Sequence, residues 1–294
     1  MKSLSANVLL LGNRNFNYYV VGKTEAVVIE CGMSTGVEIF AQQWRQIEDQ
    51  PQIKSILVLH SHFDHVCGIP MLKNLFPDTR VLASAAAQKV LSLDKVLTSL
   101  GKADEVVSAA YFSQGLISSR PAPLQIDLLT VDQVVGEGDS VDLGGNLKLN
   151  ILATPGHSPC SIAAYLANEQ IMFVSDAAGY RSPDGLMSPV FFQDYDLYME
   201  TIRRLMTYPT EILAVGHGEV VVGKGQVQQF YEQSLAAAQE AFNKIRERLA
   251  EGEQEENLAG ELYQTYIKGG LAFYPRNMML GSMYQLIKNV QARM

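Results

Sequence analysis

The chain has 294 residues, of which 47% are hydrophobic and 18% charged, and its formal net charge is −8. This composition is typical of a folded globular protein with a large core. The acidic balance, without any Lys- or Arg-rich run, disfavours nucleic acid, which proteins bind mainly through its phosphates. We expect neither a membrane span nor a secretory signal, because no apolar segment has the required length. Three widely spaced cysteines favour a cytoplasmic protein over a disulfide-bonded one.

The start of the chain predicts a sheet followed by a helix. Three short apolar runs, 7–12, 16–22 and 25–32, are separated by turn residues and are typical of neighbouring strands. Residues 35–50 have apolar side chains at helical spacing, and 53–60 is an apolar run typical of a buried strand. We therefore expect the segment after 53–60 to leave the C-terminal end of a strand.

The rest of the chain predicts a second mixed region and then helices alone. Helical patterns occupy 69–76, 85–112 and 196–208, and strand patterns occupy 80–84, several runs within 131–175, and 211–218. Beyond residue 223 the composition changes to long amphipathic helices. We therefore predict a catalytic domain at 1–223 and a helical C-terminal region at 224–294. The apolar face of this region could cover the sheets or form a homodimer with a second copy.

All five histidines lie in short motifs after predicted strands. They are His60, His62 and His65 in "HSHFDH", His157 in "TPGHS" and His217 in "VGHGE". A single histidine is usually a hydrogen-bonded core or surface residue, but here none of the five lies outside such a motif. Because side chains alternate along a strand, H-x-H puts two imidazoles on one side, and the following D-H offers a second pair.

These residue types predict two metal sites. The expected ligands are His60, His62 and His157 for one ion, Asp64, His65 and His217 for the other, and Asp176 as the bridge. Nitrogen and oxygen ligands without thiolate suit two divalent ions of zinc, iron or manganese. Open positions on both ions would hold a hydroxide, because coordination lowers the pKa of water towards about 7. We therefore predict a hydrolase whose nucleophile is hydroxide.

The motifs "HSHFDH", "TPGHS", "SDAAG" and "GHG", in this order, resemble the metallo-β-lactamase superfamily. The resemblance covers roughly residues 7–223. It implies an α/β fold, the four-layer αββα sandwich, with the metals at one edge between the sheets and the same seven ligands. True β-lactamases usually lack the complete H-x-H-x-D-H, so antibiotic hydrolysis is not expected. Flavodiiron members carry a glutamate at the position of His62 and a flavin domain, so oxygen reduction is not expected either.

Three further segments, "IECGMS", "GHGEVVVGKG" and "NMMLGSMYQLIKN", resemble the quinolone-signal response thioesterases, which act on 2-aminobenzoylacetyl-CoA. This resemblance implies thioester hydrolysis with iron or zinc, and a helical region that forms dimer contacts and part of the pocket. The chain departs from that family at Tyr180, where the family has a glutamate, so the same substrate is not implied.

Asp64, Tyr180 and Ser282 are the catalytic candidates. Tyr180 could donate its hydroxyl to a substrate carbonyl or leaving group, or only form a pocket wall. Ser282 in "LGSM" could contact substrate, or be a small residue at a helix start. Glu30 could support the metal site from behind, or be a surface charge at a strand end. Cys67 is expected to be a small buried residue.

The apolar segments 106–112 and 271–284 suggest a hydrophobic pocket near the metals, although such segments often form core. The favoured function is therefore hydrolysis of a small-molecule thioester or related ester with a hydrophobic acyl or aryl part. A lactonase and a glyoxalase II-like hydrolase are alternatives that use the same nucleophile. A protein of another class, which binds a partner and keeps the metal site only as structure, is a further alternative.

Overall fold

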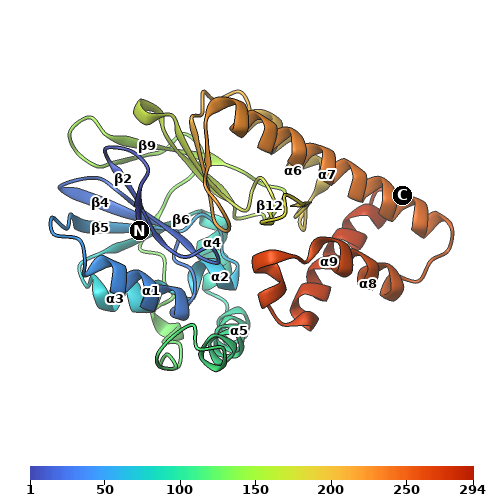
Figure 1. The fold of residues 1–294 in the computed structure, drawn as a ribbon, viewed down its shortest axis with the longest axis horizontal. Helices are drawn as coiled ribbons and strands as arrows, with labels where there is room; N and C mark the ends of the chain where they lie inside the picture. Colours follow the sequence, from blue (N-terminus) through green and yellow to red (C-terminus); the bar gives the residue numbers. More distant parts are fainter.

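Two β-sheets pack face to face in the computed structural model, which describes residues 1–294 (Figure 1). The first contains, in spatial order, β1 (Lys2–Ser3), β2 (Val8–Gly12), β3 (Asn17–Val21), β4 (Glu25–Ile29), β5 (Gln52–Leu57), β6 (Arg80–Ala83) and β7 (Gln133–Val134). The second contains β15 (Val221–Val222), β14 (Ile212–Val215), β11 (Ile171–Ser175), β10 (Ile162–Leu166), β9 (Lys148–Ala153) and β8 (Ser140–Asp142). A separate ribbon pairs β12 (Tyr180–Arg181) with β13 (Met187–Ser188).

The inner faces of the two sheets share an apolar core. Side chains of β3, β4 and β5 meet those of β9, β10 and β11 there, and the ring of Tyr19 lies edge-on to Phe173 with centroids 5.2 Å apart. Strands β4, β5, β6 and β7 run parallel to one another. The C-terminal ends of neighbouring parallel strands therefore lie at one edge of the first sheet, which is where loops place functional side chains.

Helices cover the outer face of the first sheet. They are α1 (Ser34–Trp44), α2 (Phe63–Val66), α3 (Ile69–Leu75), α4 (Ala85–Leu91) and α5 (Asp94–Ser113), with a short 3₁₀ turn η1 (Ile126–Leu128). The stretch expected as one helix at 85–112 is two helices. The second begins after Leu93, whereas Ser84 caps the first by accepting a hydrogen bond from the Ala87 amide.

The outer face of the second sheet is covered by α6 (Tyr195–Leu205) and the C-terminal region. This region contains α7 (Lys224–Ala250), α8 (Glu255–Tyr266), the 3₁₀ turn η3 (Gly269–Phe273) and α9 (Arg276–Gln291); another 3₁₀ turn, η2 (Ala167–Glu169), joins β10 to β11. Apolar side chains of the C-terminal region and of the sandwich form one cluster of 32 buried residues. The four-layer αββα sandwich with a helical C-terminal region is thus confirmed (Figure 1). None of the helices is both long and apolar enough to cross a membrane.

Candidate metal centre

The five histidines meet at one edge of the sandwich, although 157 positions separate the first from the last in sequence. His60 and His62 follow β5, His65 lies on α2, His157 follows β9 and His217 follows β14. His62 is partly buried and the other four are buried. The expected placement of "HSHFDH" just beyond the end of a strand is confirmed, and the other two motifs also follow strands.

Three imidazoles form the first group of potential ligands. His62 Nδ1 lies 3.2 Å from His60 Nε2 and 3.0 Å from His157 Nε2, and the two Nε2 atoms are 3.3 Å apart. Nitrogens that share one tetrahedral ion at about 2.0–2.1 Å are separated by about 3.3 Å. His157 Nδ1 lies 2.9 Å from the Val190 carbonyl and must donate to it, so its Nε2 presents a lone pair to the group. The separations fit a shared cation.

A second pair of imidazoles faces each other at a distance that needs a proton or a cation between them. His65 Nε2 and His217 Nε2 are 2.9 Å apart. The Nδ1 of His65 lies 2.5 Å from Glu30 Oε2, and that of His217 lies 2.5 Å from the Asn15 carbonyl. Both Nδ1 atoms face acceptors and therefore carry hydrogens, which leaves two lone pairs opposed. Asp64 Oδ2 is 3.4 Å from His217 Nε2 and supplies an oxygen to the same place.

Asp176 lies between the two groups. Its Oδ2 is 3.4 Å from His65 Nε2 and 3.7 Å from His157 Nε2, and its Oδ1 is 3.8 Å from His217 Nε2. It follows β11 directly, where Ser175 adopts a positive φ of 50°. A carboxylate in this position can reach an ion in either group. Three combinations of these seven side chains have ligand atoms close enough to hold a metal, and together they include all seven.

The electrostatics of the cluster keep His60, His62 and Asp176 in the protonation states that bind metals and draw a positive charge towards His65. Burial and the neighbouring His157 lower the pKa of His62 to about 3, and burial with the adjacent imidazoles holds the pKa of His60 well below its usual value. Burial raises the pKa of Asp176, but His65 and His217 outweigh it and hold that pKa well below the usual range. For His65 the balance is reversed, because Glu30 and Asp176 outweigh burial and raise its pKa. The centre therefore attracts a positive charge.

Glu30 supports this centre from behind. It is only 2% exposed, has a φ of 71°, and accepts a hydrogen bond from His65 Nδ1. A carboxylate in this position fixes the ring orientation and the tautomer of an imidazole ligand. Of the two interpretations left open by the sequence, the structure favours this one over a surface charge.

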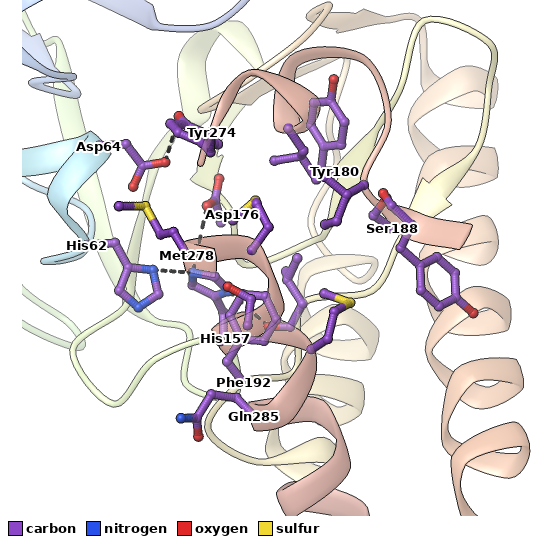
Figure 2. A pocket seen from close by; sticks show the side chains of 18 of the residues that line it. His62, Asp64, His157, Asp176, Tyr180, Ser188, Phe192, Tyr274, Met278 and Gln285 are labelled. Atoms are coloured by element: carbon purple, nitrogen blue, oxygen red, sulfur yellow. Dashed lines mark hydrogen bonds and ion pairs between the residues drawn. The ribbon is translucent and has the colours of Figure 1, made fainter. Parts of the chain in front are cut away.

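Tyr274 is a hydrogen-bond partner of Asp64 that the sequence did not reveal. Its hydroxyl donates a hydrogen bond of 2.9 Å to Asp64 Oδ2, and Figure 2 shows the two side chains facing each other. Tyr274 lies between η3 and α9, 210 positions from Asp64, and is buried. No local pattern marks such a partner, because the sequence shows it only as one aromatic residue in an apolar segment.

A cavity of about 590 Å³ opens onto the cluster, and half of its 22 lining residues are hydrophobic. The lining residues include His62, Asp64, His157, Asp176 and His217 of the cluster, and Ile267, Leu271, Met278, Met279, Ser282 and Met283 of the C-terminal region. Residues of the apolar segment 271–284 therefore line this cavity, as expected, whereas no residue of 106–112 lines it. No lysine or arginine lines this cavity.

Tyr180 and Ser282, the other catalytic candidates from the sequence, both lie at the wall of this cavity. Tyr180 lines the cavity, but its hydroxyl accepts a hydrogen bond of 2.8 Å from the Gly270 amide, and Figure 2 shows its ring directed away from Asp176. Ser282 lies on α9 at the cavity wall. Catalytic roles for both stay predictions. Cys67 is fully buried, as expected.

Comparison with known proteins agrees with this architecture. Residues 12–217 match the family model described as the metallo-beta-lactamase superfamily. A metallo-beta-lactamase fold-containing protein of Sulfurisphaera tokodaii is 25% identical over 210 residues, which cover 70% of this chain and 74% of that one. An atrochrysone carboxyl ACP thioesterase of Aspergillus fumigatus is 21% identical over 83% of this chain, which spans 63% of that protein's length.

The solved structures show the same fold. A metallo-beta-lactamase family protein from Thermus thermophilus superposes with a TM-score of 0.66 at 16% identity, covering 99% of this chain and 96% of that one. The solved archaeal protein from Sulfolobus tokodaii superposes with a TM-score of 0.60 at 19% identity, covering 98% and 99%. The match of the family model to most of the chain, with the fold and the histidine and aspartate cluster, shows that this chain belongs to the metallo-beta-lactamase superfamily.

Proposed function

We propose that this protein is a hydrolase with two divalent metal ions that cleaves thioesters with a hydrophobic acyl or aryl part. The observation that carries the proposal is the apolar cavity of about 590 Å³ that ends on the histidine and aspartate cluster. A cavity of this size and lining accommodates a small hydrophobic group next to the reacting atoms.

The donor set fits zinc, iron or manganese, since it contains imidazoles and carboxylates and no thiolate. His60, His62 and His157 would hold one ion, Asp64, His65 and His217 the other, and Asp176 would contact both. When bound, such ions lower the pKa of a water towards about 7 and polarise a substrate carbonyl. Glu30 and Tyr274 orient one imidazole and one carboxylate of this set.

The hydroxyl groups of Tyr274 and Tyr180 favour a thioester over an ordinary ester. Tyr274 donates its only proton to Asp64, and burial together with Asp64 raises the pKa of Tyr274 well above its usual value. The Tyr180 hydroxyl accepts a hydrogen bond from the Gly270 amide and keeps its own proton, but its ring is directed away from Asp176 (Figure 2). Neither group is therefore placed to protonate an alkoxide that leaves beside Asp176. A thiol, with a pKa of about 8.5 in cysteine, leaves as a thiolate without that proton.

Two relatives bear on the substrate. The Aspergillus fumigatus relative is a thioesterase. The quinolone-signal response thioesterases, which the sequence motifs resemble, also hydrolyse thioesters. A hydroxyacylglutathione hydrolase of Rhizobium meliloti is 22% identical over 60% of this chain, which favours a glyoxalase II-like activity as second candidate. No lysine or arginine lines the apolar cavity, which argues against an anionic acyl group in its apolar part.

The test combines metal analysis with a substrate panel of benzoyl-CoA, S-lactoylglutathione and an N-acyl homoserine lactone. We expect close to two metal ions per chain and preferential turnover of benzoyl-CoA. Asp64→Asn should abolish turnover and lower the metal content, whereas the matched variant Asp78→Asn, at an exposed carboxylate, should change neither. Turnover of the lactone alone would replace the thioester proposal, and turnover of S-lactoylglutathione alone would replace the hydrophobic acyl group with a glyoxalase II-like specificity. A folded protein with little metal and no turnover would favour a partner-binding role.

A further inference from the structure

A second cavity, of about 540 Å³, lies next to the first and has a different character. The two share Tyr180, whose hydrogen bond with Gly270 forms part of the wall between them. The second cavity is also close to the metal centre, because Asn15 lines it and accepts the hydrogen bond from His217 Nδ1. Only 2 of its 13 lining residues are hydrophobic. A substrate with one apolar and one polar part could occupy both cavities.

The second cavity contains polar groups without partners. Arg181 lines it, and its guanidinium makes no ion pair or hydrogen bond with the protein; it lies 5.1 Å from the centre of the Phe230 ring. Gln233 also lines it, and its Oε1 is buried with no donor in reach. The other two charged side chains of the lining, Arg14 and Glu219, pair with each other at 2.9 Å. The net charge of the lining is therefore the one positive charge of Arg181.

These unpartnered groups specify a ligand chemistry. A free guanidinium pairs best with a phosphate or a carboxylate. A buried amide oxygen without a donor is costly and is satisfied by an N–H group of a ligand. No lysine or arginine lines the apolar cavity, so a negatively charged end of the substrate that extends away from the metal ligands finds a cationic side chain only in the second cavity. A chain with amide N–H groups and a terminal phosphate would satisfy both residues at once.

We propose that the second cavity binds the phosphopantetheine arm of the thiol carrier, with its phosphate on Arg181 and an amide N–H on Gln233. This proposal rests on the proposed thioesterase function and adds the leaving group to it. The acyl part would occupy the apolar cavity, and the thiol part would extend past Tyr180 into the polar one. Free coenzyme A and an acyl carrier protein share this arm, so the phosphate subsite would serve either source.

The test compares two substrates that differ only in the phosphate, benzoyl-4′-phosphopantetheine and benzoyl-pantetheine. The measured quantity is the ratio of their kcat/KM values. We expect the phosphorylated substrate to be preferred about tenfold or more, and Arg181→Gln to remove most of this preference. Arg181→Lys keeps the charge and should keep part of the preference. Arg45→Gln, which removes an exposed arginine outside both cavities, should leave the ratio as in the wild-type protein.

Two results would overturn the proposal. One is equal kcat/KM for the two substrates in the wild-type protein. The other is an Arg181→Gln variant that slows both substrates by the same factor, because this points to lost packing on Phe230. Benzoyl-CoA and a benzoyl carrier protein are assayed in parallel to identify the natural carrier of the arm. It is the one whose kcat/KM exceeds that of benzoyl-4′-phosphopantetheine.

A direct binding measurement separates this proposal from the proposed function. Calorimetric titration of the wild-type protein with 4′-phosphopantetheine and with pantetheine requires no turnover. Tighter binding of the phosphorylated compound, reduced in Arg181→Gln, would support the subsite even if no thioester in the panel were hydrolysed. Hydrolysis of thioesters with equal binding of the two compounds would retain the function and reject the subsite.

Discussion

Tyr274→Phe tests whether the C-terminal region takes part in metal binding. The substitution removes one hydroxyl and keeps the ring, which packs edge-on against Phe63 with centroids 5.5 Å apart. Only the 2.9 Å hydrogen bond to Asp64 is lost. Because Asp64 is a proposed ligand of the second ion, the substitution should lower the affinity for that ion and leave the affinity for the first ion almost unaffected.

The size of the effect follows from the contact. A hydrogen bond to a charged acceptor contributes about 1.5–3 kcal/mol, and the lower end applies here because phenylalanine leaves no buried donor unsatisfied. Asp64 also keeps its contact with His217, 3.4 Å away. A loss of about 1.5 kcal/mol corresponds to slightly more than a tenfold weaker affinity. Second-layer contacts of metal ligands typically contribute 10–100-fold, so the two estimates agree.

The assay is a competition between the protein and a chromophoric chelator, read as two stepwise zinc affinities. Tyr284→Phe is the matched control, because Tyr284 is a partly buried tyrosine of α9 whose hydroxyl makes no hydrogen bond within the protein. We expect Tyr274→Phe to lower only one of the two affinities, by about tenfold, and Tyr284→Phe to lower neither. Equal affinities in the two variants would refute the role of the hydroxyl in holding Asp64.

Three further predictions concern the candidate metal centre and the wall of the cavity beside it. Glu30→Gln should lower the affinity for one zinc ion about tenfold in the chelator assay, because His65 loses the carboxylate that orients it. An unchanged affinity would show that any hydrogen-bond acceptor at this position suffices. Removing the metals with a chelator should lower Tm by roughly 8 °C or more, since a ligand present at a thousand times its Kd contributes about 4 kcal/mol. A Tm that metal does not raise would contradict a bound native ion. Tyr180→Phe leaves the Gly270 amide without its acceptor, so calorimetry should show a loss of about 1–3 kcal/mol in unfolding free energy. A hundredfold fall in kcat at unchanged Tm would instead favour an acid role for its hydroxyl.

Most of the candidate metal centre could be predicted from sequence because its proposed ligands come from local motifs. His60, His62, Asp64 and His65 lie within six positions, and the strand before them fixes where they emerge. The other ligands also follow strand ends with a small residue beside them, as His157 does after Gly156. Strand ends that meet at one edge bring such motifs together without any further information.

The contacts that orient the ligands could not be predicted in the same way. Tyr274 reaches Asp64 only because the C-terminal region folds back over the cavity, and the Gly270 amide meets Tyr180 for the same reason. These pairings depend on how α9 and η3 pack on the sandwich, which apolar periodicity does not specify. The same periodicity could not decide whether α7 covers the sheets or forms a dimer. In the structure Phe230 and Ile245 of α7 are buried in one apolar cluster with residues of the second sheet, α8 and α9.

This packing bears on the predicted boundary after residue 223, and α7 begins at the next residue, Lys224. The apolar cluster on the outer face of the second sheet includes Tyr198 and Ile202 of α6 as well as Phe230 and Ile245 of α7. A fragment of residues 1–223 would expose the α6 side of that cluster, and large exposed apolar patches cause association. We expect the fragment to aggregate, or to be a monomer that binds a hydrophobic dye and lacks near-ultraviolet circular dichroism. A monomeric fragment with cooperative unfolding near the Tm of the full chain would contradict this. Its zinc affinities would then separate the two roles of the C-terminal region, since a folded fragment still lacks Tyr274 and should bind the second ion more weakly.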